Sequence, residues 1–154
     1  MIQRIQSLFL LLIAACMATT AFVENWEEAA NGKRVELSAM KMTVAQAGAE
    51  VSSRNVWYIA ALALMAAAIA VYSLSRYKNR TLQTGLGAMN ALVMAGVLGL
   101  IIYFSREAET VIPDNEGIFK IGTYLPMAAL TFNILANRFI RRDEKLVRSA
   151  DRMR

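Results

Sequence analysis

Residues 57–72 of this 154-residue chain read WYIAALALMAAAIAVY and contain no charged side chain. A helix that faces water on one side carries a polar stripe there, and this stretch has none. At a rise of ~1.5 Å per residue, ~20 apolar residues cross a hydrocarbon layer ~30 Å thick. The stretch therefore favours a transmembrane helix over a buried helix of a soluble protein.

Three further apolar stretches share this length and this lack of charge. Hydrophobic residues make up 56% of the chain, which is more than the ~45–50% of soluble proteins. The sequence therefore predicts an all-α membrane protein, a single domain of four transmembrane helices in an antiparallel up-down bundle. The four predicted spans cover residues 5–23, 56–75, 82–104 and 121–137.

Basic side chains are unevenly distributed among the segments between these spans. Eleven Lys and Arg and three acids lie on one side, in the N-terminal segment, the 76–81 connection and the 138–154 tail. Five basic and nine acidic residues lie on the other side, in loops 24–55 and 105–117. Lys and Arg near span ends are retained in the cytoplasm during insertion. We therefore expect a multi-pass protein of a bacterial inner membrane with both termini in the cytoplasm.

The first predicted span has three interpretations. A basic start followed by a short apolar run also describes a cleaved signal peptide. Residues 13–16, IAAC, resemble the lipid-attachment box of bacterial lipoproteins, with Cys16 as the modified residue. Apolar character continues to Val23, which favours an uncleaved anchor over both alternatives.

Small residues in the third span predict how the helices pack. Burial of apolar surface does not drive association within lipid, whereas small residues allow close backbone approach. Asn90 and Asn133 are polar groups within the spans, and we expect them to act as structural contacts by hydrogen-bonding to each other. The residues assigned to helix packing are Gly87, Ala91, Ala95, Gly99, Asn90 and Asn133. We expect their helix to pair with the alanine-rich second span as an antiparallel hairpin.

The outer loop 24–55 is too long for a simple turn. Its Asn31-Gly32 pair favours the tight turn of a β-hairpin. Beyond this pair, apolar residues alternate with polar ones from Val35 to Ala39, and the alternation then shifts by one residue. The sequence therefore predicts a small extracytoplasmic element that includes a β-hairpin with a bulged or broken strand.

The tail 138–154 combines basic residues with an apolar side when it is placed on a helix. Anionic headgroups attract each nearby Lys or Arg by about 1 kcal/mol, so membrane-surface anchoring is one interpretation, and docking of a protein partner is the other. Nucleic-acid binding is disfavoured because no aromatic stacking platform accompanies the charge. The residues expected to contact a partner or anionic lipid are Arg138, Arg141, Arg142, Asp143, Glu144, Lys145, Arg148, Asp151 and Arg152.

The residue types present disfavour most catalytic chemistry. The chain contains no His, which is the commonest general base and metal ligand. Its single Cys16 excludes an internal disulfide and a CxxC site. We expect no catalytic residue, cofactor or metal, and a non-enzymatic scaffold or accessory subunit. The alternative is a small-solute carrier or channel lined by Asn90, Thr131 and Asn133, although transporters normally place a charged group within their spans.

The two chain ends resemble a known family. The opening MIQRIQ and the closing NILANRFIRRDEKLVRSADRMR are similar to the bacterial membrane family described as domain of unknown function 4293. Members of that family end on a run of the type RxIRxDEKLVRSxDRxR, which corresponds here to residues 138–154. The resemblance implies four spans and a cytoplasmic tail, assigns no activity, and does not include Cys16 in its pattern.

Overall fold

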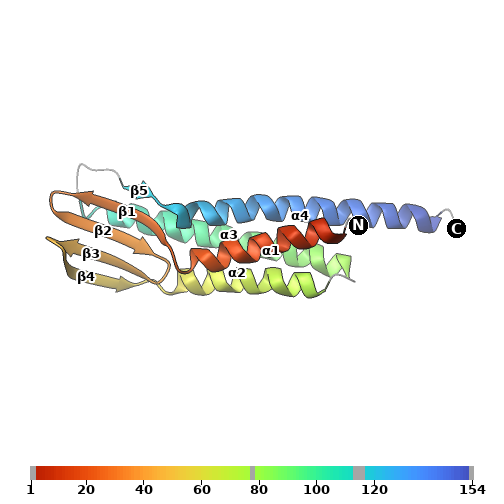
Figure 1. Ribbon diagram of the computed structural model, residues 1–154, viewed down its shortest axis with the longest axis horizontal. Helices are drawn as coiled ribbons and strands as arrows, with labels where there is room; N and C mark the ends of the chain where they lie inside the picture. Colours follow the sequence, from red (N-terminus) through yellow and green to blue (C-terminus); the bar gives the residue numbers. More distant parts are fainter. Residues whose placement is uncertain (1–2, 77–78, 113–116, 153–154) are drawn as a thin grey trace.

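The computed structural model describes residues 3–76, 79–112 and 117–152, and within them the side chains from residue 5 to residue 142. It is an elongated molecule with a small sheet at one end and a helical body that extends from it (Figure 1). Four helices form the body: α1 (Gln3–Thr20), α2 (Tyr58–Ser75), α3 (Arg80–Glu109) and α4 (Ile121–Arg152).

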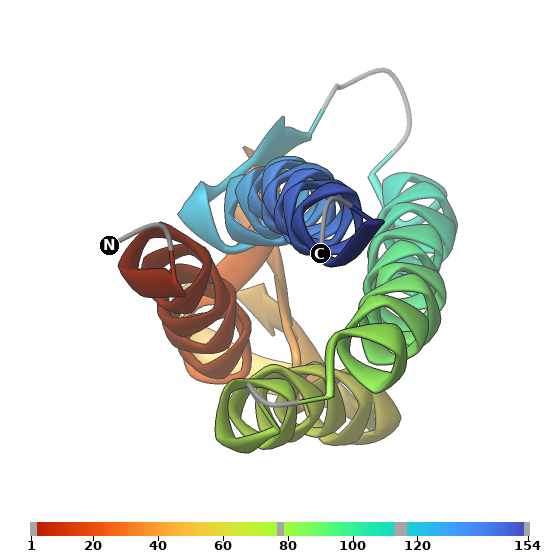
Figure 2. The same cartoon turned by 90° about the vertical axis from the view of Figure 1, so that its right-hand side faces the viewer.

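The four helices lie side by side and alternate in direction (Figures 1 and 2). Each helix contacts the next along the chain, and α4 closes the ring against α1. The end of the body opposite the sheet, where α1 begins, α2 ends and α3 begins, is called the basic end below (Figure 1). The other end, with the strands, is called the sheet end.

The described strands form one antiparallel sheet in the order β4-β3-β2-β1-β5. Two-residue turns join β1 to β2 and β3 to β4, and both carry the positive φ angles of a tight hairpin turn: 54° and 76° at Asn31-Gly32, and 53° and 85° at Ala47-Gly48. The hairpin predicted at Asn31-Gly32 is confirmed. The strands are β1 (Glu24–Ala30), β2 (Lys33–Ser38), β3 (Lys41–Gln46), β4 (Ala49–Asn55) and β5 (Ile118–Phe119).

The predicted all-α fold is wrong. Residues 24–55, expected to form a loop element with at most a hairpin, form four strands, and the second outer connection supplies a fifth. The predicted slip in alternation is the point where β2 ends at Ser38 and β3 begins at Lys41. The strands are short and half-polar, so no single strand carries the continuous apolar signal that identified the helices.

The predicted set of four transmembrane helices is also wrong. Among the described helices, only α2 and α3 are both long and apolar enough to cross a membrane, and the 18-residue windows that qualify them have mean hydropathies of 1.9 and 2.0. The apolar part of α1 covers Ile5–Thr20 alone, because the chain leaves the helix before Val23. Asn133, Asn137 and Arg138 interrupt the apolar character of α4.

Small buried residues bring α2 and α3 together as an antiparallel pair. The inward face of α2 consists largely of alanine, with Ala60, Ala63, Ala66, Ala67 and Ala70 all buried. At the basic end, the buried Gln83 donates a 3.1 Å hydrogen bond to the carbonyl of Ser73 across the pair. Asn79 caps α3 by accepting from Leu82 N–H at 3.1 Å. The expected hairpin of these two helices is therefore present.

The sheet is joined to the helices by a buried polar contact at the start of α4. The carbonyl of Asn25 on β1 accepts from the Thr123 hydroxyl at 2.7 Å and from Lys120 N–H at 2.8 Å. The Asn25 side chain is fully buried, and in the orientation that satisfies both of its groups it donates to the Gly122 carbonyl at 3.2 Å and accepts from Ala39 N–H at 3.0 Å. These contacts fix the first turn of α4 against the sheet.

Candidate anion-binding site at the basic end

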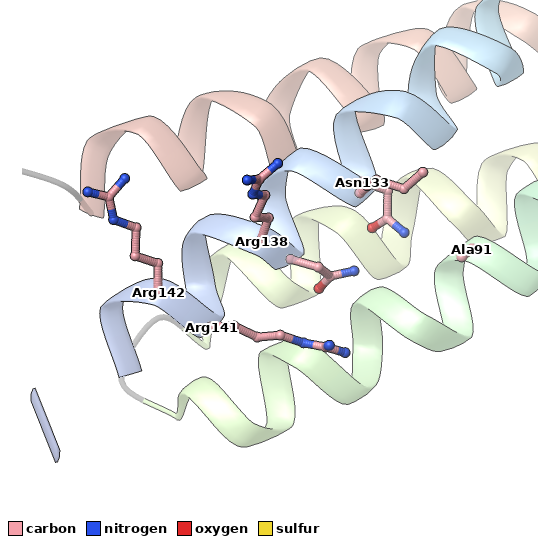
Figure 3. Close-up of a pocket in the computed structure, with 7 residues that line it drawn as sticks. Ala91, Asn133, Arg138, Arg141 and Arg142 are labelled. Carbon is pink, nitrogen blue, oxygen red and sulfur yellow. The ribbon is translucent and has the colours of Figure 1, made fainter. Parts of the chain in front are cut away.

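An open cavity of about 640 Å³ lies between α3 and α4 at the basic end (Figure 3). One residue of α3 borders it, and the remaining lining residues come from two turns and more of α4. Arg141 reaches from α4 toward α3, whereas Arg138 and Arg142 point away from α3 in this view and border the cavity elsewhere. The lining residues are Ala91, Asn133, Ile134, Asn137, Arg138, Arg141 and Arg142.

The cavity exists because α3 presents almost no side chain to α4 here. Gly87 lies in direct contact with α4, and a Cβ at this position would collide with the Asn137 amide. The Asn133 amide donates a 2.9 Å hydrogen bond to the Gly87 carbonyl. One turn further along α3, Ala91 has only a methyl group, and the space that it borders together with Ile134 and Asn137 is open.

The chemical character of the cavity is cationic. Arg138, Arg141 and Arg142 are exposed, and within the described side chains none of them forms an ion pair or donates a hydrogen bond. Arg guanidinium groups match carboxylate and phosphate oxygens with paired N–H donors. The arrangement is therefore suited to an anionic group.

The predicted contact residues divide into two sets. Arg138, Arg141 and Arg142 line the cavity. Asp143, Glu144, Lys145, Arg148, Asp151 and Arg152 continue α4 as one uninterrupted helix to Arg152, and their side chains lie outside the described set.

The residues predicted to pack the helices are also divided. Gly87 contacts α4 and Ala91 borders the cavity. Ala95 and Gly99, which continue the same spacing, are exposed on α3, and nothing lies within 4 Å of a Cβ placed on Gly99.

Two buried asparagines were expected to bond to each other. Asn133 instead bonds to the backbone of Gly87. Asn90 is buried, and its amide oxygen has no hydrogen-bond partner among the described residues. The interior face of α3 beyond it is apolar, with Met94, Val97 and Ile101 fully buried.

At the sheet end, basic side chains form ion pairs with carboxylates of the same chain. Glu27 on β1 accepts from Lys120 Nζ at 2.5 Å and from Arg34 Nε at 2.7 Å. The hydrogen bond from Lys120, followed by that from Arg34, lowers the pKa of the Glu27 carboxyl below its ordinary value. The Arg54 and Glu107 side chains form a further pair between β4 and α3.

The part of the chain that the structure describes holds no cluster of three or more His, Cys, Asp or Glu side chains suited to a metal ion. Among curated proteins, none matches the chain. A family described as domain of unknown function (DUF4293) matches residues 2–153, nearly the whole sequence.

The chain belongs to DUF4293. The resemblance of its two ends to this family is therefore confirmed. The DUF4293 match extends over the cavity and over the helical tail, and its description assigns no activity.

Sequence reasoning gave no role to two cavity residues of this DUF4293 protein, the apolar Ile134 and the polar Asn137. Asn137 marked only the end of the fourth predicted span. Its spacing of four from Asn133 places both carboxamides on the same face of a helix, and this spacing was the available signal.

Proposed function

We propose that this protein is a non-enzymatic scaffold or accessory subunit of a bacterial inner membrane, with its basic end in the cytoplasm. The observation that carries the proposal is the extension of α4. This helix continues past the ends of α1, α2 and α3 and places its C-terminal part outside the helical body (Figure 1). By sequence, that part is rich in Lys and Arg, and a projecting charged helix is suited to binding another protein.

Membrane placement is supported by the α2–α3 pair. The 18 residues of α2 extend about 27 Å at 1.5 Å per residue, close to the thickness of a hydrocarbon core. Large apolar side chains of both helices are exposed, among them Leu64, Val71 and Leu92. Contact with lipid would remove this apolar surface from water.

The orientation is supported by the charge of the α2–α3 connection. Arg76, Lys78 and Arg80 lie in or next to it, at the same end of the molecule as Arg138, Arg141 and Arg142. Retention of basic residues in the cytoplasm would place this whole end inside.

Crosslinking in intact membranes tests the docking role. Full-length protein should capture a defined protein partner, and deletion of residues 143–154 should abolish the capture. A matched control keeps the composition of residues 143–154 but scrambles their order. Capture by the scrambled chain at the level of the natural one would contradict specific docking. A reporter fused after Arg154 should be active in the cytoplasm, and periplasmic activity would contradict the orientation.

A second candidate function is that of a small-solute carrier or channel, and one observation supports it. The Asn90 amide oxygen is buried without a partner, and Asn133 borders the nearby cavity. The closely packed apolar residues beyond Asn90 make this candidate the weaker one. Uptake of small polar solutes into proteoliposomes, abolished by Asn90→Leu, would favour it over the scaffold.

A further inference from the structure

We propose that the cavity between α3 and α4 binds the phosphate of one anionic phospholipid, whose acyl chains lie along the exposed apolar faces of the same two helices. The inference rests on the membrane placement proposed above. It specifies a ligand class and a binding position at the basic end, where the positive charge alone would attract any anionic headgroup.

The polar half of the ligand is specified by the α4 residues of the cavity. Arg141 reaches toward α3 (Figure 3), and Arg138 and Arg142 add positive charge at the border. The carboxamide of Asn137 supplies a neutral donor. Since no carboxylate is present among the described lining residues, nothing in that set neutralises this charge. A phosphate group supplies the oxygens that such donors bind.

The apolar half of the ligand is specified by the next turns toward the sheet end. Ile134, which also lines the cavity, is 67% exposed, and Met127, seven residues earlier on the same face, is exposed too. On α3, the exposed Ala95 and Gly99 follow Ala91 at intervals of one turn. A shallow apolar surface therefore begins at the cavity and continues along the helices, as an acyl chain requires.

These two halves favour a lipid over a soluble phosphate compound. The cavity volume of about 640 Å³ lies in the range of ~300–1,000 Å³ usual for ligand sites. Basic pockets between membrane helices on the cytoplasmic side are suited to anionic headgroups. Attraction to a charged surface alone does not saturate, whereas a cavity of this size takes one headgroup per chain.

Native mass spectrometry of the purified full-length protein tests the proposal, with phosphatidylglycerol as probe and phosphatidylcholine as the neutral comparison. Two variants alter the site in different ways: Arg141→Gln removes the central charge, and Ala91→Leu fills the cavity without changing charge. Each should weaken phosphatidylglycerol binding about tenfold, the effect of losing a charge-assisted contact. Arg106→Gln removes one charge at the sheet end and serves as the matched control, with unchanged binding expected.

Several results would overturn the proposal. Equal retention of phosphatidylglycerol by the Ala91→Leu variant and the natural chain would show that the cavity is not the site. An equal loss of phosphatidylglycerol binding in Arg106→Gln would show that binding depends on the net charge of the protein and not on this cavity. Displacement by glycerol phosphate at the same concentration as by phosphatidylglycerol would assign the site to a soluble phosphate compound.

The outcome is separable from that of the docking proposal. Both site variants keep residues 143–154 intact, so partner crosslinking should persist in them even where lipid binding is lost. Gel filtration checks that each variant is folded. If Arg141→Gln does not fold, Ala91→Leu decides the result, and Arg141→Lys, which keeps the charge, should retain more binding than Ala91→Leu.

Discussion

The sheet end and the basic end of the molecule differ in whether their basic side chains form ion pairs within the described part of the chain. At the sheet end, basic residues pair with carboxylates within the chain, as Arg34, Lys41, Arg54, Arg106 and Lys120 do. At the basic end, the three described arginines of α4 have no carboxylate partner among the described side chains. Charge at the sheet end therefore contributes to the fold, whereas Arg138, Arg141 and Arg142 form no ion pair with any side chain that the structure describes.

The polar junction at the sheet end should be the most sensitive place in the protein. Asn25→Ala leaves Ala39 N–H and the Gly122 carbonyl buried without partners, and we expect the free energy of unfolding to fall by about 3 kcal/mol. Denaturant unfolding of the purified protein in detergent measures this. Asn79→Ala, at the basic end, removes only the exposed cap of α3 and should cost about 1 kcal/mol. Equal losses would contradict the difference between the ends.

The same substitution at two glycines sharpens the comparison. In Gly122→Ala the new Cβ would lie 2.5 Å from the Glu24 carbonyl oxygen, which belongs to the backbone and cannot move aside. We expect a loss of about 2 kcal/mol. In Gly87→Ala the new Cβ meets the Asn137 side chain, which can rotate, so about 1 kcal/mol or less should be lost. Unfolding midpoints of the two variants, measured together, test the order.

Acid should weaken the sheet end through Glu27. The pKa of this carboxyl is lowered in the folded protein, so its contribution is complete above the ordinary glutamate value of 4.5 and disappears as the pH falls through the lower, folded value. Glu27→Gln should cost about 1 kcal/mol at pH 7 and flatten the pH dependence of the unfolding midpoint in this acid range. An unaltered pH profile in the variant would show that other carboxyls determine it.

The smallest effect on stability is expected at the basic end. Since the exposed Arg141 has no described partner, Arg141→Gln should change the free energy of unfolding by no more than about 0.5 kcal/mol. The same unfolding assay, carried out without added lipid, measures it. A loss as large as that of Glu27→Gln would mean that this charge, too, serves the fold.

The helices were predictable because their signal is long and continuous. Apolar runs without charge identified α2 and α3, and the inward alanines of α2 were correctly assigned to packing. The Asn31-Gly32 turn was predictable because positive φ angles at both positions restrict the residue types. The sheet as a whole was missed because its strands are short and partly polar, and pairing between β1 and β5 joins segments far apart in the sequence.

The site was only partly predictable for a similar reason. Helical spacing identified Gly87 as a helix contact, but the same spacing assigned Ala95 and Gly99 to helix packing, and both are exposed. A periodic pattern shows which residues share a face, and it does not show which face meets a neighbour. The choice depends on how α3 is rotated against α4, which the contact between Gly87 and Asn133 determines.

Helix α4 is a single rod that begins at the sheet and ends beyond the arginines. Its 32 residues correspond to a length of about 48 Å, and its first turn is clamped to β1 by Thr123. Pro126, which cannot donate a backbone hydrogen bond, lies in the next turn, so bending is easiest just past the clamp. The helix from Pro126 to Arg152 is about 39 Å long, so a tilt of about 5° at Pro126 would move the far tip sideways by about 3 Å.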